Sequence, residues 1–168
     1  MLCPKHTGLH RTIKRYLLLA AFLHFLGGRI PAQPAFDWAR HVPASFSLPG
    51  GDDQGVEIAE DGFGNFYLCG FFGGAAQIGD TVLQSAGGTD IFVAKFNSQG
   101  LLLWGRAIGG RGADRALGLA VDKTGNAYVT GNFSEFIDAD PGPGVSLITS
   151  RGQTDVFLCK LDPAGGLM

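Results

Sequence analysis

Two acidic side chains in a glycine-rich segment have the residue types and spacing to bind a metal ion. Asp138 and Asp140 alternate with Ala139 and are followed by Pro141-Gly-Pro-Gly144. Alternating carboxylate oxygens in such a loop are ligands that Ca²⁺ accepts. No glutamate follows at the spacing of an EF-hand, and Pro141 also suits an ordinary turn. A calcium site at Asp138 and Asp140 and a plain turn therefore both stay open, and the sequence favours the turn.

Residues typical of catalysis are scarce. His41 is the only histidine after residue 32, which excludes a zinc site with several imidazoles and leaves a Ser-His-Asp arrangement dependent on this one side chain. We expect His41 to be a solvent-facing strand residue. The glycine runs at 62–64 and 109–112 are not followed by the helix start that a phosphate loop requires. The sequence predicts no catalytic residue and no cofactor other than the calcium considered above.

Six aspartates recur as pairs: Asp53 with Asp114, Asp61 with Asp122, and Asp90 with Asp155. Because each pair recurs at the same place in a repeat, capping of turns explains them better than catalysis. We expect the two members of a pair to lie in different repeat units rather than side by side.

Two cysteines remain after the N-terminal segment, Cys69 and Cys159. They align with Thr130 and Ala94 in the other repeat, so the repeat itself requires neither thiol. Secretion would permit a disulfide, but we expect two small buried residues.

The chain is built from an internal repeat. Residues 51–73 match residues 112–134 at an offset of 61, with identities that include Gly64/Gly125, Asn65/Asn126 and Tyr67/Tyr128. Residues 86–100 match 151–165 at an offset of 65, and the four extra residues lie in the insertion at 138–144.

Short strands joined by defined turns are predicted within each unit. The expected strands are 56–59, 66–72, 91–96, 101–108, 117–121, 127–133 and 156–161. The turns 61–65, 122–126, 97–100 and 162–165 open on Asp or Asn and contain or end on Gly. This pattern is typical of a type I turn followed by a left-handed glycine. No helical period occurs beyond the N-terminal segment.

The expected fold class is all-β, with antiparallel four-stranded β-propeller blades. A β-sandwich is the alternative, although sandwiches do not normally repeat turns and aromatic residues in register. The first repeat spans 51–110, and the second, truncated repeat spans 111–168. Residues 33–50 are interpreted as a linker and the final strand, 36–42, of a preceding blade.

Residues 1–32 have the features of a secretory signal peptide. Four basic residues precede an apolar run at 16–26, and small residues lead to Ala32, where we expect cleavage. The run is shorter than the roughly 20 residues of a membrane-spanning helix; an uncleaved anchor and a buried helix are the alternatives. The sequence predicts a secreted or cell-envelope protein.

Charge narrows the choice of partners. Five of the 13 basic residues and none of the 15 acidic residues lie in 1–32, so the remainder carries a formal net charge of −7. An acidic domain is a poor partner for nucleic acid and for an anionic membrane.

The motifs resemble a known family. The runs 89–96 and 100–104, Gly109-Gly110, Asp114, 119–122, Gly125-Asn126 and 128–131 are similar to the bacterial β-propeller repeat family labelled SBBP. The resemblance implies a secreted or surface-exposed bacterial protein with many tandem blades and generally no assigned enzymatic activity. One whole blade and most of another are too few to close a ring, so we expect a fragment of a longer array or an assembly of copies.

The expected function is therefore that of a non-catalytic scaffold or binding surface. Its partners are an extracellular protein or glycan, or further blades of the same or another chain. The alternative is an accessory domain of an exported enzyme acting on polysaccharide or peptide, with catalytic residues outside this chain. A truncated reading frame with no independent role is the third interpretation.

Overall fold

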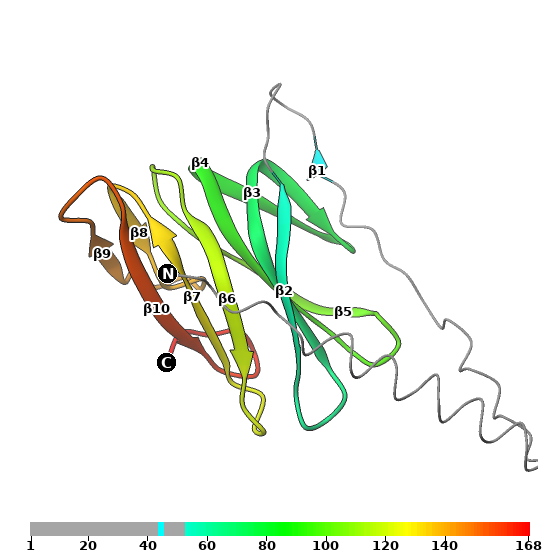
Figure 1. Ribbon diagram of the computed structural model, residues 1–168. Helices are drawn as coiled ribbons and strands as arrows, with labels where there is room; N and C mark the ends of the chain where they lie inside the picture. Colours follow the sequence, from blue (N-terminus) through cyan, green and yellow to red (C-terminus); the bar gives the residue numbers. More distant parts are fainter. Residues whose placement is uncertain (1–43, 46–52) are drawn as a thin grey trace, which may run out of the picture. The chain divides into compact units, whose positions relative to one another are not determined.

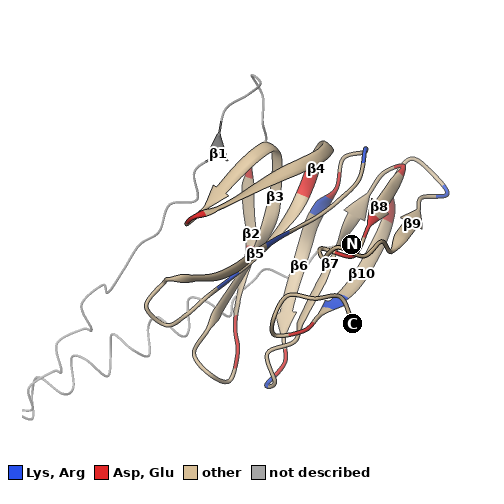
Figure 2. Ribbon diagram, turned by 180° about the vertical axis from the view of Figure 1, so that it is seen from behind, with Lys and Arg blue, Asp and Glu red and all other residues tan. Residues whose placement is uncertain are grey.

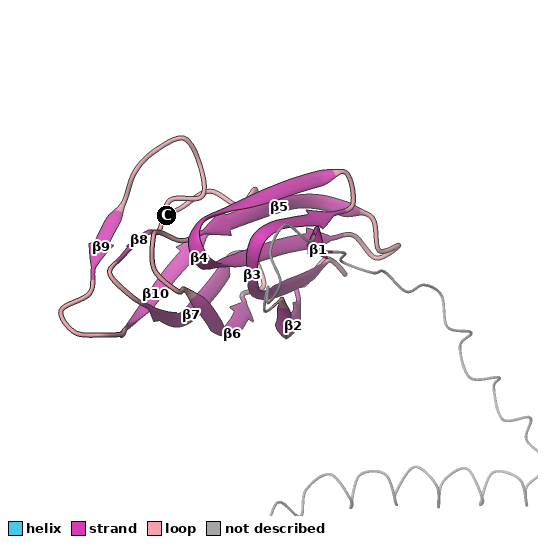
Figure 3. Cartoon of the chain, turned by 90° about the horizontal axis from the view of Figure 1, so that it is seen from above, coloured by secondary structure: helices cyan, strands magenta, loops and turns pink. Residues whose placement is uncertain are grey.

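The computed structural model describes residues 44–45 and 53–168, which form ten strands and no helix (Figures 1 and 3). The chain divides into two units, Met1–Asp37 and Trp38–Met168, and all described residues lie in the second. No helix long and apolar enough to cross a membrane occurs among the described residues. The predicted signal peptide, the strand at 36–42 and His41 lie outside them.

The first repeat forms an antiparallel sheet. Its strands are β2 (Gln54–Glu60), β3 (Phe66–Ile78), β4 (Thr81–Phe96) and β5 (Leu102–Ile108). β2 pairs with β3 over 66–71, β3 pairs with β4, and β4 pairs with β5. A two-residue strand, β1 (Ala44–Ser45), pairs farther along β3 at Ala75 and Ala76.

The second repeat forms a three-stranded antiparallel sheet in the order β10-β7-β6. These strands are β6 (Arg115–Val121), β7 (Ala127–Phe133) and β10 (Asp155–Leu161). A separate hairpin, β8 (Phe136–Asp138) with β9 (Leu147–Thr149), occupies the link between β7 and β10. On the free side of β10, Leu167 forms a bridge to Leu161 and the Met168 N–H donates to the Lys160 carbonyl at 3.0 Å.

The predicted turns are confirmed by their glycines. Gly64, Gly100, Gly125 and Gly165 have φ angles of 78°, 72°, 87° and 81°, a region that L side chains rarely adopt. The Asp or Asn that opens each turn accepts hydrogen bonds from backbone N–H groups within the turn. These local contacts fix the hairpins before any long-range packing is considered.

All seven predicted strands of the described region are confirmed, and β7 has the predicted bounds. The prediction was wrong where strands continue or where none was expected. β3 and β4 extend past the predicted strands into a distal hairpin, and the stretch between the predicted strands 127–133 and 156–161, which contains the insertion, forms β8 and β9. The distal hairpin is stabilised by burial of Ala76, Ile78 and Leu83. This burial was not predictable from the sequence, because the segment is short and glycine-rich and has few large apolar residues.

Two apolar clusters lie on opposite faces of the first sheet. The larger contains one face of the first sheet, including Tyr67 and Val93, together with one face of the second, including Phe133 and Leu161. The smaller contains the other face of the first sheet, including Phe92, together with the distal hairpin. Phe92 and its match Phe157 each pack over a glycine of the neighbouring strand: a Cβ at Gly70 or Gly131 would lie 2.6 Å or 2.8 Å from the ring. This packing explains the repeated glycine.

Candidate functional site

Each repeat presents two faces, which we name by their matched residues. Strand alternation places Tyr67, Cys69, Ile91, Val93 and Lys95 on what we call the A face of the first repeat. Leu68, Phe72, Phe92, Ala94 and Phe96 form its B face. The matching A face of the second repeat is Tyr128, Thr130, Val156, Leu158 and Lys160, and its B face is Val129, Phe133, Phe157, Cys159 and Leu161.

The A face of the first repeat packs on the B face of the second. Tyr67, Cys69, Ile91 and Val93 share one buried cluster with all five B-face residues of the second repeat. Few charged residues lie along these strands (Figure 2), so burial of apolar area is the main source of stability at this interface.

Polar side chains of the first repeat hold two turns of the second. Tyr67 Oη donates to the Gly125 carbonyl at 2.8 Å, inside the turn 122–126. Trp104 Nε1 and Lys95 Nζ donate to the Pro163 carbonyl at 3.0 Å and 3.5 Å, inside the turn 162–165. Lys95 Nζ also lies 3.5 Å from Asp61 Oδ2 and 4.8 Å from the Tyr67 ring centre. These donors set the register in which one repeat meets the next.

The A face of the second repeat has the same chemistry, and no residue of the described ranges 44–45 and 53–168 packs over its apolar part. Ile91 and Val93 are 0% exposed, whereas their matches Val156 and Leu158 are 76% and 70% exposed. Lys160 Nζ lies 5.3 Å from the Tyr128 ring centre, in the same relation as Lys95 to Tyr67. Tyr128 Oη contacts Asp122 Oδ2 of its own repeat at 3.4 Å instead of a neighbouring turn.

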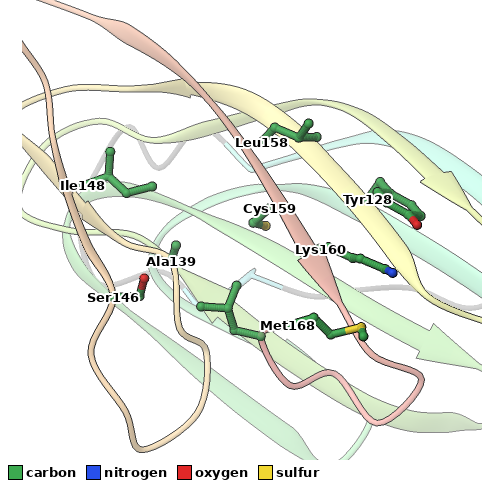
Figure 4. Close-up of a pocket in the computed structure, with 9 residues that line it drawn as sticks. Tyr128, Ala139, Ser146, Ile148, Leu158, Cys159, Lys160 and Met168 are labelled. Carbon is green, nitrogen blue, oxygen red and sulfur yellow. The ribbon is translucent and has the colours of Figure 1, made fainter.

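A cavity of about 380 Å³ borders this open face. It is lined by Tyr128, Leu158, Cys159 and Lys160 of the sheet, by Ala139, Ser146 and Ile148 of the β8–β9 region, and by Leu167 and Met168. Figure 4 shows side chains of the sheet and of the β8–β9 region facing the same space. Its lining is largely apolar, with the Lys160 amine and the Tyr128 ring close to each other.

One segment of the chain matches a known protein family. The family model SBBP, described as a beta-propeller repeat, matches residues 103–132. The chain contains an SBBP-type repeat. The matched segment begins in β5, crosses the junction between the two repeats and ends in β7, so it includes Trp104 and Tyr128. No curated protein matches the chain.

The repeated aspartates accept backbone hydrogen bonds at matched positions of the two repeats, and the predicted turn capping is confirmed for Asp61 with Asp122 and for Asp90 with Asp155. The matched bond of Asp53 and Asp114 instead joins residues twenty positions apart and does not cap a turn. Asp90 Oδ2 accepts from the Ala86 N–H at 2.9 Å, and its match Asp155 accepts from the Arg151 N–H at 2.7 Å. Asp53 accepts from the Gly73 N–H at 3.0 Å, and Asp114 accepts from the matching Ser134 N–H at 3.3 Å. The hydrogen-bonded positions are the same in both repeats.

Sequence reasoning missed one juxtaposition, because it compared only matched aspartates. Asp90 lies in β4 of the first repeat and Asp114 near the start of the second, and both are buried. The Asp114 N–H donates to the Thr89 carbonyl at 2.7 Å, which brings the two aspartates close together. Burial, with the repulsion of Asp114, raises the pKa of Asp90 to about 6, and burial likewise raises the pKa of Asp114 to about 6. Asp90 Oδ1 accepts no hydrogen bond. No signal in the sequence alone brings these two residues together, because their approach arises between the repeats.

The predicted metal residues lie at the start of the β8–β9 link. Asp138 Oδ1 accepts from the N–H groups of Asp140 and Ser146, at 3.1 Å and 2.8 Å, and Asp140 Oδ1 accepts from the Gly142 N–H at 2.8 Å. These are the contacts of a plain turn. No group of three or more His, Cys, Asp or Glu side chains able to hold a metal occurs in the described part of the chain. Calcium binding by Asp138 and Asp140 stays a prediction.

The two cysteines are free and buried, as expected from the repeat alignment. Both belong to the cluster between the repeats. Burial raises the pKa of each thiol to about 11, so both are protonated near neutral pH and act as small apolar residues.

Proposed function

We propose that this chain is a secreted or cell-surface, non-catalytic repeat module that serves as a scaffold or binding surface. One observation carries the proposal: matched apolar residues are covered by the next repeat at Ile91 and Val93 and uncovered at Val156 and Leu158. An acidic, apolar-faced module of this kind suits association with protein rather than with nucleic acid.

We further propose that each repeat is a four-stranded propeller blade. In the first repeat, β2, β3, β4 and β5 are neighbours in that order. In the second, the pairing of residues 167–168 with β10 supports a fourth strand on the same side as β5 in the first. Stacking such units buries a continuous core, which one unit alone does not possess.

The partner that best fits the open A face is the B face of a further repeat, in the same or another chain. Tyr67 and Lys95 donate to carbonyls of the second repeat's turns. Tyr128 and Lys160 occupy the matching positions, so an incoming repeat would present its own turn carbonyls to them. The apolar residues beside this pair on β10, Val156 and Leu158, would meet the residues of the incoming repeat that match Phe157 and Leu161.

The turn-capping roles of the aspartates support the non-catalytic part of the proposal. Asp61 and Asp122 hold their turns, and Asp90 and Asp114 are buried at the junction. Export is tested separately, by mass spectrometry of the protein recovered outside the cell. A mature N-terminus near residue 33 would support export with cleavage. An intact Met1 in the envelope fraction would contradict the signal peptide and indicate an uncleaved anchor.

Packing at the open face is tested by adding a repeat. Met168 matches Leu103, so a further copy of residues 104–168 can be attached directly after Met168 in register. We expect the extended chain to unfold at higher urea than the natural chain, because the new B face covers Val156 and Leu158.

Leu158→Lys provides the site-specific readout. In the natural chain this residue is exposed, so the change should alter the free energy of unfolding by less than about 0.5 kcal/mol. In the extended chain it should cost more than about 2 kcal/mol, because a lysine amine would be buried. Val82→Lys, at an exposed residue off this face, is the control and should have little effect in both chains. Equal small effects of Leu158→Lys in both chains would refute packing at this face.

A further inference from the structure

The B faces of the two repeats are covered in different ways. In the second repeat, Phe133 and Phe157 pack against the first repeat. In the first repeat, their matches Phe72 and Phe92 pack against Ala76, Ile78 and Leu83 of the distal hairpin formed by β3 and β4. The distal hairpin therefore covers the B face of the first repeat, as a neighbouring repeat covers the B face of the second.

The sequence bends the hairpin onto its own sheet at a defined point. Gly74 has a φ of 71°, and the β3–β4 register shifts between Gly73 and Ala75. Asp53 accepts from the Gly73 N–H, and Ser85 Oγ accepts from the Gly74 N–H at 2.9 Å. A left-handed glycine inside a bulge redirects both strands, and these two side chains hold the bend.

Contacts with β5 show how far the hairpin reaches across the face. A Cβ placed on Gly105 would lie 3.7 Å from Thr81 Cγ2 and 4.0 Å from Leu83 Cδ1. A Cβ on Gly79 would lie 3.3 Å from Leu102. The hairpin thus covers β3, β4 and β5. It leaves β2 open, because Ile58 is 63% exposed while its match Leu119 is 7% exposed.

The matching hairpin of the second repeat is placed differently. Ile137, which matches Ala76, is buried in the cluster between the repeats, and Asp138 forms a bridge to Gly109 of the first repeat. Leu147 is exposed in the same hairpin. β8 and β9 therefore lie at the junction between the repeats and do not cover the B face of the second repeat, which packs against the first repeat.

We infer that the distal hairpin, residues 74–85, is an end cap that closes the B face of the first repeat. While this cap is closed, further repeats add only at the A face of the second repeat, so the array grows in one direction. This inference rests on the proposed packing function. A second copy of the chain cannot dock head to tail while the cap is closed, because Ala76, Ile78 and Leu83 occupy the place of the incoming A face.

Removal of the cap should make the protein self-associate. The full chain is expressed in its host cell, so that any processing of its N-terminus is retained. Deletion of residues 75–84 joins Gly74 to Ser85 and exposes Phe72 and Phe92 to the A face of another copy. Sedimentation should give the deletion variant an association constant at least tenfold larger than that of the natural chain. Heterologous contacts of this type build rings or filaments. Leu158→Lys in the same variant should abolish the gain, because it disrupts the other half of the contact.

A cross-link keeps the inference testable if the deletion variant does not fold. In the full chain, Thr81→Cys with Gly105→Cys should form a disulfide on mild oxidation, whereas Val82→Cys with Gly105→Cys should not, because Val82 points to solvent. Equal cross-linking of the two pairs, or of neither, would overturn the cap. So would equal self-association of the natural and deleted chains, or a gain that Leu158→Lys leaves intact. The extended chain described above tests the A face alone, so its result separates failure of packing from failure of the cap.

Discussion

The two repeats have closely matched residues and different surroundings. Val93 is buried because the second repeat lies against it, and Leu158 is exposed although it occupies the same position and is the larger side chain. The B faces show the converse, because matched phenylalanines are buried by the first repeat in one case and by the distal hairpin in the other. Burial in this molecule is therefore decided by the neighbour and not by the residue, as expected for units that contact only adjacent units.

The largest expected effect comes from placing a charge at matched A-face positions. Val93→Asp should destabilise the natural chain by about 3–5 kcal/mol, because it buries an unpaired carboxylate between the repeats. Leu158→Asp should change stability by less than about 0.5 kcal/mol. Urea unfolding of both variants measures the difference. Similar losses would show that the A face of the second repeat is covered in solution.

The acid pair at the junction predicts a pH dependence. The pKa values of Asp90 and Asp114 are raised to about 6 from an ordinary 3.8, so the folded protein holds these protons more tightly than the unfolded chain does. Their contribution to stability is fully present below about pH 4 and is lost as the pH rises through 6. We expect the chain to be about 2 kcal/mol more stable at pH 5 than at pH 7.

Other carboxyls bound the pH window and provide the controls. The pKa of Asp61 is lowered, because hydrogen bonds from Asn65 and Phe63 and the Lys95 charge outweigh its desolvation, and hydrogen bonds from Thr124 and Asn126 lower that of Asp122 strongly. Their contribution is lost only below about pH 4, so Asp61 and Asp122 do not contribute to a change in stability between pH 5 and pH 7. Glu135 adds repulsion at Asp114.

Asp90→Asn should reduce the pH dependence of stability by about half, and the matched Asp155→Asn should preserve it. An unchanged slope in Asp90→Asn would contradict the assignment to the junction pair.

Local chemistry made most of the fold predictable from the sequence. Turns that open on Asp61, Asp122 or Asp162 have side-chain acceptors and a left-handed glycine within a few residues, so the sequence locates them directly. Apolar alternation then places the strands between them. The distal hairpin was not predictable in this way, because its position depends on Phe92 and Leu102 offering an uncovered face.

In the candidate site too, some features were predictable from the sequence and others were not. The repeat pattern predicted turn capping by Asp61, Asp122, Asp90 and Asp155, because such capping follows from positions within one repeat. Burial of both cysteines was also predicted, although it arises in the cluster between the repeats. The approach of Asp90 to Asp114, and the exposure of Val156 and Leu158, arise between units. A comparison of matched positions cancels such differences, so the open face and the acid pair required the three-dimensional arrangement.

The smallest expected effect concerns one hydroxyl group in each repeat. Tyr67→Phe removes the donor to the Gly125 carbonyl at a fully buried position, which leaves that acceptor without its partner and should cost about 1–2 kcal/mol. Tyr128→Phe removes only a 3.4 Å contact with Asp122 near the open face and should cost less than about 0.5 kcal/mol. Thermal unfolding of the two variants in the natural chain measures this pair. In the chain extended by residues 104–168, Tyr128 should acquire the neighbour that Tyr67 already has, and the two losses should become equal. If Tyr128→Phe remains neutral there, the added repeat does not dock in the register set by Tyr67, even if it covers Leu158.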